Sequence, residues 1–233
     1  MKKILLCIVL LINALSLRSQ VTHQQTYWTR LGVRVKLDDK WTIQIQADNR
    51  RFFGENQQLQ FITHLDFRRK FRKNTEGVLG SSFSEVWQGD LPVPELRFFQ
   101  ECNTFQKITE KLRLFHRFRI EQRWFHNYAK NVFGSETLTS GYNFKFRFRY
   151  MPRLEYKWNE KWTLRANAEL MYHHDDFDQY RYYGGVDYKI LTDLSIEMGY
   201  LKVYQKRANN KGYFDRDNLR VTVFKDFVVK NKK

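Results

Sequence analysis

This chain has few cysteines and few long apolar runs, and each shortage excludes a class of protein. Only two cysteines occur in 233 residues, and Cys7 lies in an N-terminal segment that we expect to be removed. Cys102 then has no partner, which excludes an internal disulfide even in an oxidising compartment. After Leu17 no stretch approaches the roughly 20 apolar residues of a membrane-crossing helix, so a helical membrane protein is excluded.

The mean hydropathy is also low, at −0.66, but a low average does not indicate a soluble protein. The strands of a transmembrane barrel alternate between apolar and polar residues, so their average over any window is close to polar. The sequence further lacks a glycine-rich phosphate loop, a Cys-x-x-Cys pair and a His-Glu-x-x-His motif. We therefore expect no cofactor and assign no catalytic residues.

The first residues have the layout of a secretory signal peptide. An apolar run follows two lysines, and small Ser19 offers a cleavage point before Gln20. Cys7 lies inside the apolar run rather than at its end, which disfavours a lipid anchor. We predict that residues 1–19 are cleaved and that residues 20–233 form one domain.

Basic residues outnumber acidic ones, with 41 Lys and Arg against 25 Asp and Glu and a formal net charge of +16. Such an excess is typical of proteins that bind nucleic acid or an anionic surface. Basic and aromatic residues alternate at 145–150, a pattern that also suits an RNA-stacking sheet. The pattern recurs in nearly every expected strand and follows a secretion signal, so we expect no nucleic-acid partner. Arginines that line an interior and pair with glutamates explain it better.

The most regular pattern lies at residues 142–157. Its even positions are aromatic or apolar, from Tyr142 to Tyr156, and its odd positions are mostly charged. Successive side chains of a strand point to opposite faces, so the segment predicts a strand with one apolar and one charged face. It is far longer than the roughly 5–6 residues of an average strand. A long strand that is apolar outside and charged inside is typical of a barrel in a lipid bilayer.

The same alternation predicts strands along the rest of the mature chain. The segments are 29–37, 43–48, 59–68, 76–87, 95–106, 112–124, 162–172, 180–189, 194–204 and 214–224. Short polar turns alternate with longer links, as in outer-membrane barrels with short periplasmic turns and long external loops. The longer links are expected at 52–57, 88–95, 125–141, 173–179 and 205–213. Single-chain bacterial barrels have even strand counts, so ten or twelve strands are expected, with an extra one from 19–26 or 227–230.

All six tryptophans lie near the ends of expected strands. Tryptophan prefers the membrane–water interface. We therefore predict interface positions for Trp28, Trp41, Trp87, Trp124, Trp158 and Trp162. The alternative is a soluble β-sandwich, whose core would have to bury much of 20 Phe, 13 Tyr and 6 Trp. The core of one small domain has no room for so many aromatic side chains, whereas the lipid-facing wall of a barrel can carry them.

Three segments carry a resemblance to a known family. They are WTRLGVRVKLDDKWTIQIQADNR at 28–50, HRFRIEQRW at 116–124 and FKFRFRYMPRLEYKWNEKWTL at 144–164. The chain resembles the outer-membrane β-barrel family of Gram-negative bacteria that is catalogued as domain of unknown function 2490. The resemblance implies an outer-membrane barrel over essentially the whole mature chain. The family carries no established activity, so the resemblance implies no catalytic residue.

The charged face of the expected strands is the best candidate for a functional site. Its charged residues are Arg117, Arg119, Glu121, Arg123, Arg147, Arg149, Arg165 and Glu169. In a narrow lumen these side chains would interlock as a salt-bridged plug. Alternatively, the excess of arginine would attract an anion such as phosphate or carboxylate. The sequence leaves both alternatives open.

A weaker candidate is the segment from His173 to Asp178 in an expected outer loop. His174, Asp175 and Asp176 could bind a divalent metal, and a histidine beside carboxylates could activate water. Adjacent residues of a strand point to opposite faces, so His173 and His174 can both ligate a metal only if the loop bends. A solvated loop is therefore the expectation, and no metal site is predicted.

The sequence thus predicts an all-β fold, a single closed antiparallel up-and-down transmembrane β-barrel of about 10–12 strands in the bacterial outer membrane. We expect outer-membrane lipid around it and a larger envelope assembly as a candidate partner. The leading function is a structural or accessory barrel, or a narrow anion-preferring channel, without enzymatic activity. The alternative is a membrane-embedded hydrolase of lipid or peptide, with its site at the rim near His173 to Asp178.

Overall fold

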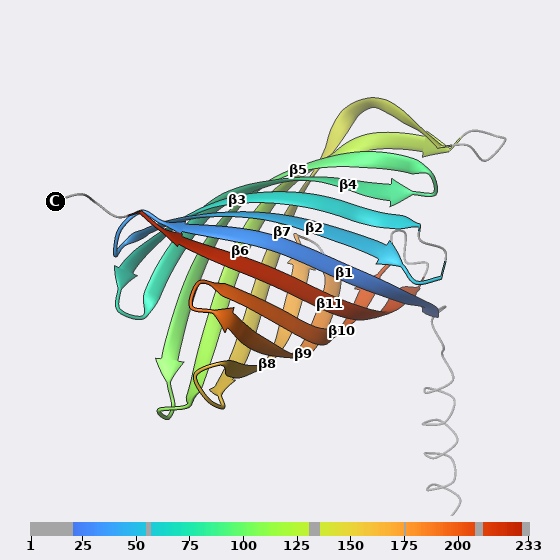
Figure 1. The fold of residues 1–233 in the computed structure, drawn as a ribbon. Helices are drawn as coiled ribbons and strands as arrows, with labels where there is room; N and C mark the ends of the chain where they lie inside the picture. The colour runs from blue at the N-terminus through green and yellow to red at the C-terminus, as the bar shows by residue number, and fades with distance from the viewer. Residues whose placement is uncertain (1–20, 55–56, 131–135, 175, 208–211, 230–233) are drawn as a thin grey trace, which may run out of the picture.

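The computed structural model of the chain describes residues 21–54, 57–130, 136–174, 176–207 and 212–229 (Figure 1). These residues form eleven strands. They are β1 (Val21–Lys36), β2 (Trp41–Phe52), β3 (Gln58–Arg72), β4 (Thr75–Gln88), β5 (Leu91–Lys107), β6 (Leu112–Lys130), β7 (Glu136–Lys157), β8 (Trp162–His173), β9 (Phe177–Leu191), β10 (Leu194–Lys206) and β11 (Tyr213–Val228). The predicted signal peptide, residues 1–19, lies outside the described residues.

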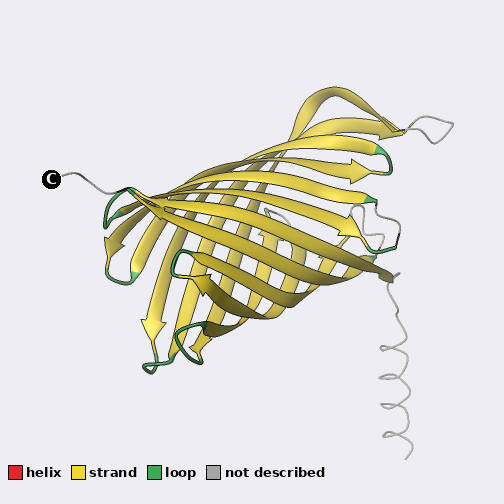
Figure 2. Cartoon of the chain, viewed as in Figure 1, coloured by secondary structure: helices red, strands yellow, loops and turns green. Residues whose placement is uncertain are grey.

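The strands close into one barrel, which confirms the predicted fold class. Each strand pairs with the next along the chain in antiparallel fashion, and β1 also pairs with β11. Figure 2 shows that nearly all of the described residues lie in strands of one continuous wall. In the part of the chain that the structure describes, no helix is long and apolar enough to cross a membrane.

The seam between the first and last strands corrects the expected even strand count. β1 and β11 run parallel, in register from Val21 opposite Tyr213 onward. Residues 21–26 lengthen β1, and Phe227 and Val228 lengthen β11, so neither segment adds a separate strand. An odd number of up-and-down strands necessarily brings the first and last strands together in the same direction.

The two ends of the barrel differ less in loop length than expected. We call the end that joins β1 to β2 the turn end, and the opposite end the loop end. The expected links at 88–95 and 125–141 are mostly strand, because β4 and β5 meet at Gly89 and β6 and β7 extend to Lys130 and Glu136. Gly89 adopts a φ of 59°, which glycine accepts readily and which makes the tight turn possible.

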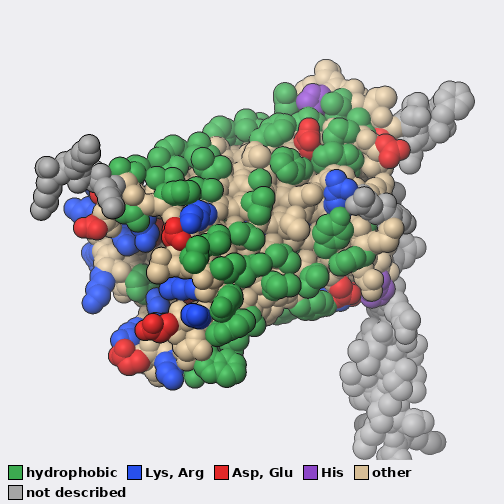
Figure 3. Space-filling view, viewed as in Figure 1, with side chains coloured by type: hydrophobic (Ala, Val, Ile, Leu, Met, Phe, Trp, Pro, Cys, Tyr) green, Lys and Arg blue, Asp and Glu red, His purple; other side chains and the backbone are tan. Residues whose placement is uncertain are grey.

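Apolar side chains cover the outside of the barrel, and charged side chains fill the inside. On the outer face, Leu31 of β1 is 62% exposed, whereas Asp48 and Glu121 on the inner face are 0% exposed. Figure 3 shows hydrophobic side chains across the middle of the wall, with charged side chains gathered mainly toward its two ends. A soluble sandwich has the reverse arrangement, so this alternative is excluded.

Aromatic rings lie flat against the inner wall where a glycine leaves room. A Cβ on Gly185 or Gly199 would overlap the ring of Tyr183, so only glycine allows this approach. The hydroxyl of Tyr183 donates a hydrogen bond to Glu197 at 2.7 Å. The guanidinium of Arg220 lies 3.7 Å from the centroid of the same ring. The ring is thereby held between the wall and a cation, within the lumen.

Candidate functional site

The inside of the barrel holds a cavity of about 1530 Å³, lined by residues from all eleven strands. The cavity extends along the barrel, because Glu76 and Gln88 near opposite ends of β4 both line it, as do Ser195 and Gln205 of β10. Arginine and lysine side chains outnumber aspartate and glutamate side chains along its wall by about two to one. The lumen is therefore the candidate functional site.

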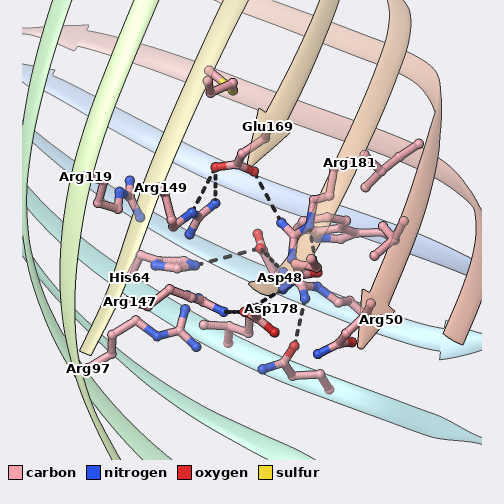
Figure 4. A pocket seen from close by; sticks show the side chains of 18 of the residues that line it. Asp48, Arg50, His64, Arg97, Arg119, Arg147, Arg149, Glu169, Asp178 and Arg181 are labelled. Carbon is pink, nitrogen blue, oxygen red and sulfur yellow. Dashed lines mark hydrogen bonds and ion pairs between the residues drawn. The ribbon is translucent and has the colours of Figure 1, made fainter. Parts of the chain in front are cut away.

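Two buried glutamates in the middle of the lumen bind the arginine side chains around them. Glu121 on β6 accepts hydrogen bonds from Arg147 at 2.7 Å and from Arg149 at 2.6 Å. Glu169 on β8 accepts hydrogen bonds from Arg149 at 2.6 Å and from Arg117 at 2.5 Å. Arg149 therefore bridges the two glutamates, and Figure 4 shows it beside Glu169. We call these five residues the central network.

Arg119 and Arg123 bind other carboxylates beside the central network. Arg119 donates a hydrogen bond to Glu101 at 2.6 Å. Arg123 donates to Glu95 at 2.6 Å, and Glu95 also accepts a hydrogen bond from Arg97 at 2.8 Å. Each of these arginines therefore binds a carboxylate, and Arg97 and Arg123 share Glu95.

Strand register produces many of these ion pairs. Side chains that lie opposite each other on one face of neighbouring strands are close enough to interact directly. Register partners of opposite charge on the inner face include Glu101 and Arg119, Glu121 and Arg147, Glu155 and Arg165, and Glu169 and Arg181. The predicted charges are thus brought together by pairing across strands.

Arg165 lies apart from the other predicted residues, nearer the turn end. Its guanidinium contacts Asp187 at 3.1 Å and Glu155 at 3.3 Å, and it also binds Glu197. Arg220 of β11 binds Glu197 as well. The other predicted charges lie in or beside the central network, so Arg165 alone belongs to a second cluster.

The loop half of the lumen contains charges that are not among the predicted site residues. Asp48 and Arg50 of β2 and Arg181 of β9 face one another across the cavity (Figure 4). Asp48 accepts two hydrogen bonds from Arg30, at 2.6 and 2.8 Å. Asp48 and Arg50 continue the inward alternation of Gln44, but the strand was expected to end at residue 48. If the expected strand had extended to Phe52, as β2 does, the same alternation would have predicted that Arg50 points into the lumen.

Trp28 lies inside the lumen, so the predicted interface position is wrong for this tryptophan. Its side chain is 4% exposed, and the guanidinium of Arg50 lies 3.7 Å from the ring centroid. Trp28 alternates in phase with Arg30 on β1 and therefore points inward. The position on the strand outweighs the general preference of tryptophan for the interface.

The other tryptophans lie toward the two ends of the wall. Trp41, Trp158 and Trp162 are exposed at the turn end. Trp124 packs against phenylalanine rings on the outer face of β6. Trp87 is half-buried near the loop end of β4 and borders the cavity. An interface role for these five side chains stays a prediction.

The segment from His173 to Asp178 lies at the loop end, and Asp175 lies outside the described residues. The Nε2 atom of His173 is 3.6 Å from Asp178. Asp178 also accepts a hydrogen bond from Arg147 at 3.1 Å. Among the residues that the structure describes, no group of three or more His, Cys, Asp and Glu side chains could hold a metal ion.

Asp176 lies in the same loop, outside the strands. The ammonium of Lys206 and the backbone N–H of Phe177 hold the pKa of the Asp176 carboxyl below its ordinary value. A carboxylate with a lowered pKa is a weaker base, so Asp176 is suited to an ion pair rather than to proton transfer. His174 lines the cavity near this loop.

An apolar outer wall around a charged, hollow interior defines a transmembrane β-barrel of the outer-membrane type. The chain belongs to the family described as protein of unknown function (DUF2490), whose model matches residues 25–214. The matched range runs from β1 to the start of β11, which confirms the resemblance noted in the sequence. The family description supplies no activity and no site residues.

A solved structure with a similar fold is titled "NanC porin structure in rhombohedral crystal form". It has 13% sequence identity to this chain and a TM-score of 0.52, and the match covers 82% of this chain and 92% of that chain. At this identity the likeness shows the fold alone, which is porin-like. Among curated proteins, no sequence matches the chain.

Proposed function

We propose that the chain is an integral outer-membrane barrel that forms a narrow channel with a preference for anions. One observation carries this proposal: a single cavity follows β4 and β10 from near one end to near the other, and its wall has an excess of cations. Surplus cations in a narrow lumen give a positive potential, which favours the entry of anions over cations.

The ion pairs of the lumen support a channel of fixed shape. Arginine and carboxylate side chains that bind each other in fork geometry hold one another in place. Arg117, Arg149 and Glu169 of the central network line the cavity, so open space continues beside them. A path that passes fixed guanidinium groups would be selective without requiring a moving gate.

Lys145 of β7 offers a direct test, because it lines the cavity and makes no ion pair among the described residues. In a planar bilayer under a salt gradient, the wild-type reversal potential should indicate anion preference. The substitution Lys145→Glu should shift it toward cations, because one positive charge in the lumen becomes negative. Lys73→Glu makes the same change in an exposed turn outside the cavity and should leave the reversal potential unchanged.

Two outcomes would contradict the proposal. A folded barrel that conducts no ions would favour an accessory barrel within a larger envelope assembly, and co-purification from native membranes would identify its partners. Conductance with a preference for cations would leave the channel in place and overturn the anion preference.

The hydrolase alternative has less support. Asp178 beside His173 already accepts a hydrogen bond from Arg147. In the described part of the chain, no serine, threonine or cysteine side chain is bonded to His173, so the pairing of nucleophile and base that such an enzyme needs is missing. Hydrolysis of lipid or peptide by the wild-type barrel, abolished by His174→Ala, would reverse this conclusion.

A further inference from the structure

We propose that the arginines around Trp28 form a binding site for an oxyanion, a carboxylate or phosphate group, in the loop half of the lumen. The inference deepens the proposed channel function, because it places a specific site on the path of the permeating anion. The three arginines of the central network are balanced by its two glutamates together with Asp178, which binds Arg147. The available positive charge lies elsewhere.

The ring of Trp28 is surrounded by guanidinium groups from four strands. Arg50 of β2 lies 3.7 Å from the ring centroid, and Arg30 of β1 lies at 5.1 Å. Arg181 of β9 and Arg220 of β11 each lie at 5.9 Å. Contact with the negative face of an aromatic ring stabilises each cation, so the ring holds several positive charges close together.

Among the described residues, two of these four cations, Arg50 and Arg181, donate no hydrogen bond to a carboxylate. Asp48 is bound by both nitrogens of the Arg30 fork, and it lies 3.6 Å from Arg50. Glu169 is bound by Arg149 and lies 3.7 Å from Arg181. Arg50 and Arg181 therefore share carboxylates that other arginines already occupy.

The direct hydrogen-bond partners of Arg50 and Arg181 are neutral. Arg50 donates to the side-chain oxygen of Gln60 at 2.7 Å. Arg181 donates to the side-chain oxygen of Gln179 at 3.3 Å. An amide oxygen orients a guanidinium without cancelling its charge. The two arginines are thus fixed in direction, and their charge stays available to a ligand.

Two buried hydrogen-bond donors beside these arginines have no acceptor among the described residues. The Nε1 atom of Trp28 and the Nε atom of Arg50 are buried and have no hydrogen-bond acceptor in the described structure. A buried donor without an acceptor is costly, so a ligand that brings acceptor oxygens would be favoured there. The planar guanidinium fork matches the oxygens of carboxylate and phosphate groups, and this geometry identifies the ligand class as oxyanions rather than halides.

The test is a calorimetric titration of the detergent-folded full-length barrel with sodium phosphate and, separately, with sodium acetate. Sodium chloride at matched ionic strength is the reference. Saturable binding of phosphate, acetate or both is expected, and the comparison shows which oxyanion is preferred. Arg50→Gln and Arg181→Gln should each weaken binding by about tenfold, because each removes a charge-assisted hydrogen bond.

Arg34→Gln is the matched control, because Arg34 also lines the lumen but binds Asp226 at 2.6 Å and lies away from Trp28. It should bind phosphate like the wild type. Arg50→Lys keeps the charge and the fold while losing the planar fork, and it should also bind more weakly than the wild type. These variants separate a specific site from a general positive potential.

Two results would overturn the site: no saturable binding of either anion, or an equal loss of binding in Arg34→Gln. Bilayer conductance is measured on the same preparations, so the two proposals fail separately. A barrel that conducts anions but binds neither probe keeps the channel and loses the site. A barrel that binds phosphate without conducting keeps the site and loses the channel.

Discussion

At the scale of single residues, the partner of each lumen arginine decides whether its charge is available to a solute. Arg149 binds both Glu121 and Glu169, so its charge is fully balanced within the wall. Arg216 near the loop end instead donates to the side-chain oxygens of Gln24 and Gln205, at 2.6 Å each. One residue type therefore stabilises the lumen in one place and leaves a positive charge in another.

Loss of Glu121 should destabilise the barrel strongly. Glu121→Ala leaves Arg147 and Arg149 buried with one carboxylate fewer, and a broken buried ion pair costs roughly 3 kcal/mol or more. The free energy of unfolding in urea, measured in lipid vesicles, checks this value. Glu160→Ala in an exposed turn should change it by less than about 0.5 kcal/mol. Equal effects of both substitutions would show that the central network does not stabilise the fold.

At the scale of strands, the two-residue period determined which face each side chain occupies, and it could be read from the sequence for most of the wall. It holds even for Trp28, where the preference of the residue type was misleading. It was obscured at Pro92 and Pro94, which made the start of β5 resemble a loop. β5 pairs with β4 at both prolines, but its pairing with β6 begins only at Glu95. Proline is tolerated there because one side of the strand is unpaired.

The ion-pair partners could not be predicted in the same way, because they depend on register between strands. The alternation places Arg119 and Glu121 on one face but does not reveal that Glu101 lies opposite Arg119. Glu95, which binds Arg123, lay at the edge of an expected loop. A shift of one residue in register moves every side chain of a strand to the other face, so these pairs become visible only in the folded barrel.

The parallel seam between β1 and β11 can be tested by cross-linking. Thr29 and Val221 are register partners, and neighbouring strands lie about 4.8 Å apart, within the range of a disulfide. In a Cys102→Ser background, Thr29→Cys combined with Val221→Cys should form a disulfide on mild oxidation, seen as a mobility shift on a gel. Thr29→Cys combined with Leu219→Cys is displaced by two residues and should cross-link far less. The opposite result would mean that the barrel closes differently.

At the scale of the whole molecule, the barrel inverts the arrangement of a soluble protein. The buried apolar residues inside the barrel include one small cluster of Trp28, Tyr183, Leu201 and Val203, while large apolar side chains cover the outside. Closure of the sheet pairs the backbone groups of every strand, which a bilayer requires. The hydrophobic contribution to stability must therefore come mainly from contact with lipid or detergent.

The sequence could predict the barrel fold but could not decide between a plug and a channel. Whether a lumen is open depends on how far side chains from opposite walls reach, and that distance follows from strand number and tilt rather than from local pattern. Arg117, Arg147, Arg149 and Glu169 of the central network line the cavity, and this became visible only when the strands were placed around it.

The depth of the outer wall in the bilayer gives the most general test. Leu65 lies in the middle of β3 on the outer face, whereas Trp158 lies at the turn end. An arginine on the lipid face of a barrel costs roughly 2–4 kcal/mol at the midplane and about 0–1 kcal/mol near the interface. Leu65→Arg should therefore destabilise the barrel in lipid vesicles clearly more than Trp158→Arg does, although both add the same charge. The free energy of unfolding measures the difference. Equal costs would mean that the middle of this wall does not contact hydrocarbon, and a membrane channel through the barrel would then be untenable.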